Sequence, residues 1–158
     1  MSQPMTIDAP RGASRKKLLA GFVAGFLAVL LFHQTALLLL SHVGFIHASV
    51  YSMHPTAPLG VPKVLSLAFW GGVWGVLFAL IENRLPGGVL YWVLAILFGA
   101  IFPTAVAWFV VFPLKGLAVG GGWRFKSMAT GLLINGAWGL GTAIFLALLG
   151  AKSRSTPV

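Results

Sequence analysis

Long apolar stretches alternate with short polar segments along this chain of 158 residues. Four of these stretches have about the 20 residues that a helix needs to cross the hydrocarbon core of a bilayer. Their approximate limits are 18–41, 64–81, 89–112 and 128–149. Because unpaired backbone groups are costly in lipid, such stretches are expected to be helical. The pattern therefore predicts an all-α fold, an integral membrane four-helix bundle.

The segments outside the apolar stretches divide the chain into a membrane domain and two tails. The first stretch follows Arg15-Lys16-Lys17, which resembles the start of a signal peptide. It is longer than a signal-peptide core and no A-x-A site follows it, so an uncleaved anchor is expected. We predict a disordered cytoplasmic tail over 1–16, the four-helix domain over 17–150 and a second cytoplasmic tail over 151–158.

Composition supports the membrane interpretation. Hydrophobic residues make up 58% of the chain and charged residues 8%, and the mean hydropathy is +0.94. Soluble domains carry roughly a quarter charged residues, so this chain lacks the polar surface of a soluble protein. There is no cysteine, which excludes disulfides and thiolate metal sites.

The formal net charge of +9 comes from basic residues near the helix ends. The chain has no basic stripe interleaved with aromatic residues, so nucleic acid is not an expected partner, whereas anionic lipids are. With a cytoplasmic N-terminus, seven basic residues lie inside: Arg11, Arg15, Lys16, Lys17, Arg84, Lys152 and Arg154. Four lie outside: Lys63, Lys115, Arg124 and Lys126. This excess predicts cytoplasmic N- and C-termini in a bacterial inner membrane.

Short motifs recur in the same order in both halves of the chain. GGVWGV (71–76) in the second stretch is similar to NGAWGL (135–140) in the fourth. FHQTA (32–36) in the first stretch is similar to FPTA (102–105) in the third. The recurrence predicts two tandem helical hairpins, a parallel repeat related by an axis along the membrane normal.

Small residues are spaced for close helix contact. Gly21 and Gly25 form a GxxxG pair, Gly71 and Gly75 form another, and Ala137 and Gly141 form a small-xxx-small pair. Such pairs let helix backbones approach in lipid. Packing within the chain is the favoured interpretation, and a homodimer is the alternative.

Polar residues interrupt the apolar stretches at a similar depth in the outer half of the bilayer. At 1.5 Å per residue, His33 and Thr104 each lie about 12 Å below the outer helix end. The predicted ligand or hydrogen-bond layer contains His33, Gln34, Thr35, Trp70, Thr104 and Asn135. Such a layer either fixes helix register or lines a small cavity for a ligand, an ion or a proton. On a helical wheel, His33 faces away from the glycine seam, toward another helix, another subunit or lipid.

The first outer loop contains potential metal ligands. His42, His47, Met53 and His54 have side chains that suit Cu(I) or another transition metal. Their spacing matches no named metal motif, so an ordinary interfacial loop is the alternative. Haem would need paired axial ligands, and only His33 lies within a predicted helix. No cofactor is therefore expected.

Charged residues near the interfaces have local interpretations. Glu82 ends the second stretch, where it is expected to be a solvated acid paired with Arg84, and a proton relay is the alternative. Arg124 and Lys126 follow a run of three glycines. Backbone N–H groups and two cations suit a lipid phosphate, although a flexible loop is the alternative.

The stretch YSMHPTAPLGVPKVLSLAFWGGVWG (51–75), with FHQTA (32–36) upstream, resembles small hypothetical four-helix inner-membrane proteins of proteobacteria. The resemblance extends over about residues 20 to 150. It implies location and architecture, and it implies no activity and no site residue.

Function is less constrained than architecture. The chain has no nucleophile elbow, no HExxH motif and only two acidic residues, so we do not expect an enzyme. A structural or accessory membrane subunit, alone or with a membrane-complex partner, is the leading hypothesis. A small transporter or channel with a path through the polar layer is the first alternative. A metal- or haem-binding redox helper is the second.

Overall fold

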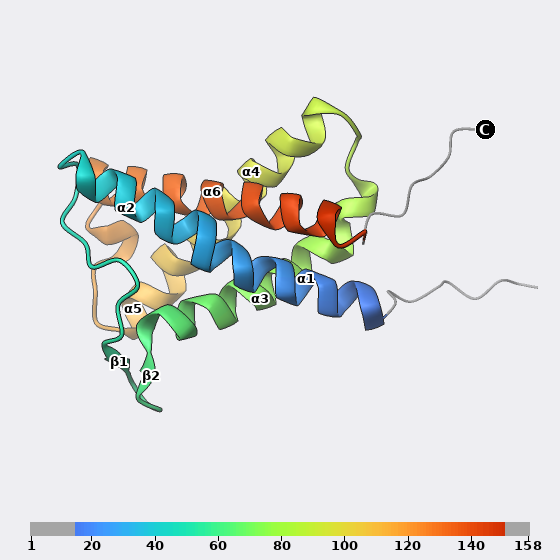
Figure 1. Cartoon of the computed structure of the whole chain (residues 1–158). Coiled ribbons are helices and arrows are strands. Elements are labelled where there is room, and N and C mark those ends of the chain that lie inside the picture. The colour runs from blue at the N-terminus through green and yellow to red at the C-terminus, as the bar shows by residue number, and fades with distance from the viewer. Residues whose placement is uncertain (1–14, 151–158) are drawn as a thin grey trace, which may run out of the picture.

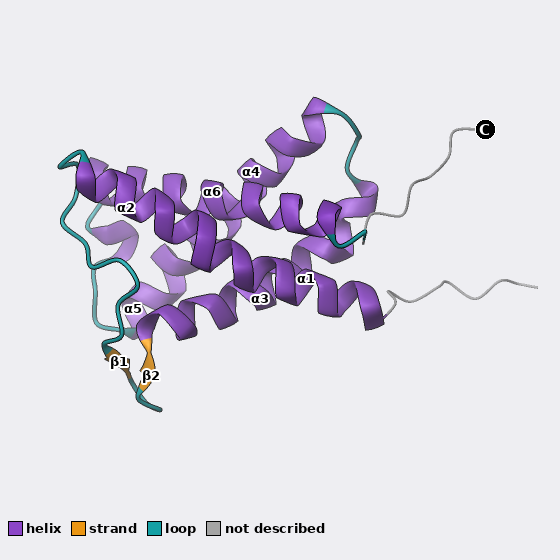
Figure 2. Ribbon diagram, viewed as in Figure 1, coloured by secondary structure: helices purple, strands orange, loops and turns teal. Residues whose placement is uncertain are grey.

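The computed structural model describes residues 15–150, and positions 1–14 and 151–158 lie outside the described residues. Helices dominate, with one short β-ribbon (Figures 1 and 2). The elements are α1 (Arg15–Ala28), η1 (Val29–His33), α2 (Gln34–His42), β1 (Pro55–Thr56), β2 (Val61–Pro62), α3 (Lys63–Ile81), η2 (Glu82–Arg84), α4 (Val89–Val106), η3 (Ala107–Val111), α5 (Phe112–Leu114), η4 (Val119–Gly121) and α6 (Phe125–Leu148). Here η1 and η3 are π-helical, and η2 and η4 are 3₁₀-helical.

Consecutive elements join into four helices that are long and apolar enough to span a membrane. These spans are Arg15–His42, Lys63–Arg84, Val89–Leu114 and Phe125–Leu148. The all-α four-helix prediction is confirmed. The first span begins at Arg15, so Arg15 and Lys16, which the sequence assigned to the tail, are helical.

The chain runs back and forth through the bundle. In Figure 1 the start of α1 and the end of α6 lie at one end, with the connection between α3 and α4. The loop of residues 43–62, which contains the β1–β2 ribbon, lies at the opposite end. The ribbon pairs Pro55 with Pro62 and leads directly into α3. Both described ends therefore lie on the same side of the bundle.

Glycines bring α1 and α3 into backbone contact. A Cβ atom added at Gly25 would lie 2.1 Å from the carbonyl oxygen of Gly71. One added at Gly75 would lie 2.2 Å from the carbonyl oxygen of Gly21. No side chain fits at such distances, so the two predicted GxxxG pairs pack against each other within the chain.

A second seam joins α4 to α6 in the same manner. A Cβ atom at Gly99 would lie 2.3 Å from the carbonyl oxygen of Asn135, and one at Gly139 would lie 2.3 Å from that of Ala95. The chain thus contains two tightly packed pairs of helices. Because van der Waals contact is a main source of helix association in lipid, these seams hold each pair together.

The two pairs meet through larger side chains. Trp138 of α6 is buried and contacts α1, and Gly141 of α6 accommodates the ring of Phe32. Between α3 and α4, the ring centroids of Phe78 and Phe98 lie 5.2 Å apart, and those of Trp74 and Phe98 lie 6.2 Å apart. Rings therefore fill the space between α3 and α4, which have no glycine seam of their own.

The predicted duplication is consistent with part of this packing. GGVWG in α3 and NGAWG in α6 both supply seam residues, at Gly71 and Gly75 and at Asn135 and Gly139. In the predicted Ala137–Gly141 pair, Gly141 packs against the Phe32 ring of η1, and Ala137 lines the two hollows described below. The tandem repeat itself stays a prediction.

Candidate functional site: polar clusters within the bundle

A first polar cluster lies where the first span meets the outer loop. His33 and Gln34 are buried, with exposed fractions of 8% and 2%. The Gln34 amide nitrogen lies 3.4 Å from His33 Nδ1. Gln34 Oε1 accepts a 2.8 Å hydrogen bond from the backbone N–H of Tyr51. The His33 side chain therefore belongs to the protein interior, and Gln34 anchors the loop that follows.

The π-helical turn η1 explains how this cluster forms. The Gln34 N–H bonds to the carbonyl of Val29, five residues back, instead of to that of Leu30. The Leu30 carbonyl instead accepts a 2.6 Å hydrogen bond from the Tyr51 hydroxyl. The extra residue in the turn also rotates His33 relative to a regular helical wheel. A wheel drawn with a regular period therefore gives the wrong direction for the His33 side chain.

Tyr51 is held in a rare backbone conformation. Its φ angle is +50°, in the left-handed region that non-glycine residues seldom occupy. Two hydrogen bonds, from its backbone N–H and from its hydroxyl, fix it to the first span. The backbone and the side chain of Tyr51 thus both attach the loop to the first span, at Gln34 and Leu30, well inside the end of the span at His42.

A second polar cluster joins α4 to α6. The side-chain amide of Asn135 donates a 2.8 Å hydrogen bond to the Thr104 hydroxyl. That hydroxyl donates in turn to the carbonyl of Gly131, at 3.2 Å. Thr104 is 1% exposed, so the bond forms away from water. Two of the predicted layer residues therefore meet as hydrogen-bond partners.

The six predicted residues do not form one continuous layer. Between residues 15 and 150, no hydrogen bond joins the His33–Gln34 cluster to the Thr104–Asn135 cluster. Thr35 is exposed and its hydroxyl bonds to the Leu31 carbonyl of its own helix. Trp70 is 58% exposed and makes an edge-to-face contact with its neighbour Phe69. Trp70 lies on the side of α3 that faces away from the glycine seam. Its indole is therefore outside both clusters.

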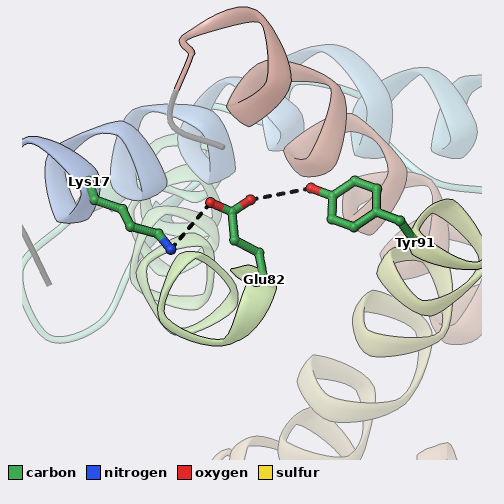
Figure 3. A network of polar contacts seen from close by, with 3 residues as sticks. All are labelled: Lys17, Glu82 and Tyr91. Carbon is green, nitrogen blue, oxygen red and sulfur yellow. Dashed lines mark hydrogen bonds and ion pairs between the residues drawn. The ribbon is translucent and has the colours of Figure 1, made fainter. Parts of the chain in front are cut away.

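A third cluster, at the opposite end of the bundle, is ionic (Figure 3). Glu82 is 1% exposed. One of its carboxylate oxygens lies 3.5 Å from Lys17 Nζ, and the other accepts a 3.3 Å hydrogen bond from the Tyr91 hydroxyl. The expectation of a solvated acid paired with Arg84 is wrong. The 3₁₀ turn η2 directs Glu82 into the bundle, where its partners come from α1 and α4.

The loop side chains proposed for a metal do not gather. His42, His47, His54 and Met53 are all exposed. Among residues 15–150 no three His, Asp or Glu side chains lie close enough to hold a metal ion. His33 is the one buried histidine of this part of the chain.

The residues proposed for a lipid headgroup lie at the start of α6. Arg124 precedes the helix and Lys126 is in its first turn, and both side chains are exposed. Lys126 Nζ lies 5.7 Å from the centre of the Phe45 ring, which follows α2. The two cations are therefore presented at the loop end of the bundle.

Two hollows open on the outside of the bundle. One, of about 430 Å³, lies between the first span and α6, and the other, of about 230 Å³, lies between α4 and α6. Their walls are almost entirely apolar, and neither is lined by His33, Gln34, Thr104 or Asn135. The buried polar side chains thus bond to other parts of the protein and do not line either hollow.

Sequence reasoning missed three residues of these clusters. Tyr51 lies in a loop, and Lys17 and Tyr91 lie near helix ends, where solvent or interfacial positions were expected. One signal was present, since Lys17 and Glu82 are charges of opposite sign at the same predicted membrane face. Opposite charges near one end of neighbouring spans are candidates for pairing.

No known protein family, curated protein or solved structure matches this chain.

Proposed function

We propose that this protein is a non-enzymatic structural or accessory subunit of a bacterial inner membrane, with both termini in the cytoplasm. The observation that carries the proposal is the use of the buried polar groups. Asn135 and Thr104 bond to each other across two helices, and Gln34 bonds to the backbone of Tyr51. These side chains hold two helices together and fix a loop to the first span.

The energies involved fit a structural role. Hydrogen bonds between membrane helices contribute roughly 1 kcal/mol each. One such bond supports the α4–α6 seam, and the bonds of Tyr51 fix the outer loop on the first span. The polar groups therefore add register and loop position to helices that the glycine seams already hold together.

One side of the bundle is suited to a partner. In the third span only 17% of an apolar stretch of 18 residues is buried, compared with 33–39% of the corresponding stretch in the other three spans. A helix this exposed presents a long apolar face to its surroundings. Within a larger membrane complex, a partner helix would pack on this face, which supports the accessory role.

Location and orientation belong to the same proposal. By sequence, seven basic residues precede the first span, follow the fourth or lie between the second and third, whereas four lie in the other two connections. This excess favours a cytoplasmic location for the first set. The resemblance of residues 51–75 to small proteobacterial membrane proteins supports the inner membrane.

Asn135→Ala tests this role, with Asn83→Ala as a matched control, because Asn83 is exposed in the inner turn. We expect Asn135→Ala to lower the melting temperature by a few degrees and Asn83→Ala to leave it unchanged. Proteoliposomes with the wild-type protein should pass protons and K⁺ no faster than protein-free liposomes. A wild-type flux that Asn135→Ala abolishes and Asn83→Ala keeps would overturn the proposal.

A small transporter is the second candidate. The ionic cluster of Lys17, Glu82 and Tyr91 favours it, because buried ionisable groups in membrane helices often mark ion or proton paths. Proton flux in proteoliposomes that requires Glu82, and that Glu82→Gln removes without lowering thermal stability, would select the transporter over the structural subunit.

A further inference from the structure

The two apolar hollows flank a single small residue of α6. Ala137 contributes to both of them. The larger hollow is lined by Leu31, Phe32, Thr35, Ala36, Leu39 and Ala137. The smaller is lined by Ile96, Leu132, Leu133, Gly136, Ala137 and Leu140. Ala137 therefore lies between two apolar grooves, one toward the first span and the other toward α4.

A basic residue lies on the same face of α6, nearer the loop end. Positions 7, 11 and 14 residues apart fall on one face of an α-helix, so Lys126 lies in line with Leu133, Ala137 and Leu140. The contact of Lys126 Nζ with the Phe45 ring places the cation toward the end of α2, which is the other wall of the larger groove. Arg124, the residue before α6, is a second exposed cation near the same end of the helix.

The spacing between cation and grooves equals the depth of one leaflet. Ala137 follows Lys126 by eleven residues, which is about 16 Å along the helix at 1.5 Å per residue. The hydrocarbon core is about 30 Å thick, so one leaflet is about half of that. A chain that descends from a headgroup at Lys126 therefore reaches Ala137 near the middle of the bilayer.

We propose that this face of α6 binds one anionic phospholipid with two acyl chains. Lys126 and Arg124 bind the phosphate, and the two chains lie in the grooves on either side of Ala137. The side chain of Ala137 is short enough to let both chains approach the helix. The site does not depend on the proposed subunit role, because either a subunit or a transporter can carry a bound lipid.

Charge favours a lipid over a second copy of the chain on this face. The whole sequence contains two acidic residues, Asp8 and Glu82. Glu82 is buried in the ionic cluster at the opposite end of the bundle, and Asp8 precedes the first span in the sequence. A second copy in the same orientation would bring no carboxylate to Lys126 or Arg124. An anionic lipid brings its phosphate to both.

Native mass spectrometry of the purified, delipidated full chain tests the site, with dioleoyl phosphatidylglycerol (DOPG) and dioleoyl phosphatidylcholine (DOPC) as probes. We expect the wild-type protein to retain DOPG at least fivefold better than DOPC. Lys126→Gln should weaken DOPG binding about fivefold, because each cation near a membrane surface contributes about that factor. Lys115→Gln removes another exposed outer cation and should have no effect.

The grooves are tested by Ala137→Leu, with Ala147→Leu as its control on an exposed position of the same helix. We expect Ala137→Leu to weaken binding of both lipids roughly tenfold, since each chain loses contact for about one methylene group. Ala147→Leu should bind as the wild type does. Because both variants add a side chain at the lipid-facing surface, equal melting temperatures show that the effect is not unfolding.

Three results would overturn the proposal. Equal retention of DOPG and DOPC by the wild type would remove the headgroup preference. Glycerol 3-phosphate that binds as tightly as DOPG would indicate a simple anion site without grooves. Ala137→Leu that turns a dimer into a monomer while lipid retention stays constant would assign the face to a second copy.

Discussion

The indole N–H of Trp138, in the fourth span, donates a 2.9 Å hydrogen bond to the backbone carbonyl of Gly25, in the first. The two residues are 113 positions apart in the chain. Gly25 lacks a side chain that would cover its carbonyl, and it is also the residue at which α1 touches α3 most closely. One glycine therefore serves the seam within the first hairpin and the contact between the hairpins.

Trp138→Phe is expected to destabilise the bundle by about 1 kcal/mol, because it keeps most of the ring and removes the donor. Thermal unfolding in detergent, followed by circular dichroism, measures the change. Trp74→Phe is the control, since the contact of Trp74 with Phe98 is between rings and Phe preserves it. Equal losses in the two variants would show that the hydrogen bond adds nothing beyond packing.

Gly25→Ala and Gly139→Ala should each destabilise the protein by roughly 2–3 kcal/mol. Both add a methyl group where a neighbouring carbonyl oxygen lies within 2.3 Å, so the helices must separate. Gly87→Ala is the control, because a Cβ atom there meets nothing within 4 Å. Melting temperatures of the three variants check this. A Gly25→Ala protein as stable as the wild type would contradict the close backbone contact between α1 and α3.

Lys17→Met should destabilise the protein more than Glu82→Gln does. The first leaves a fully buried carboxylate without its cation, which costs roughly 3 kcal/mol. The second leaves a lysine that is 14% exposed and can turn toward water. A double-mutant cycle in detergent measures the coupling, and the double variant should be more stable than Lys17→Met alone. Lys16→Met, an exposed neighbour, should be neutral, and additive effects would disprove the pairing.

Tyr51→Phe should loosen the outer loop without unfolding the helices. It removes the hydroxyl that bonds to the Leu30 carbonyl, a net loss of about 1 kcal/mol. Hydrogen–deuterium exchange over residues 43–62 should become roughly fivefold faster, while exchange in α3 and α6 stays constant. Met53→Ala, at an exposed position of the same loop, is the control. Unchanged exchange in Tyr51→Phe would mean that the backbone bond to Gln34 is sufficient to hold the loop.

Position along the helices was enough to predict that Thr104 and Asn135 can meet. The rise of a helix converts position into height, so Thr104 and Asn135 were expected at one level, and they are hydrogen-bonded. The same reasoning failed for Trp70, because height does not specify which way a side chain points. Trp70 is at a comparable depth and faces outward.

Irregular backbone was the main obstacle. The π-helical turn η1 changes the direction of His33 and leaves the Leu30 carbonyl to Tyr51. Neither consequence follows from a regular period of 3.6 residues. The 3₁₀ turn η2 has a similar effect on Glu82, which it directs into the bundle instead of toward solvent.

The sequence by itself determined the class of fold, the four spans and the glycines that form the seam between α1 and α3. Lipid leaves the backbone no alternative to hydrogen-bonded helices, and glycine pairs four residues apart mark one helix face whatever its partner. Only the tertiary structure decided which polar groups meet. Pairs such as Glu82 with Lys17 and Gln34 with Tyr51 depend on how the helices rotate about their axes and on how a loop folds back. Those choices are made by contacts between residues far apart in the chain, where no local pattern records them.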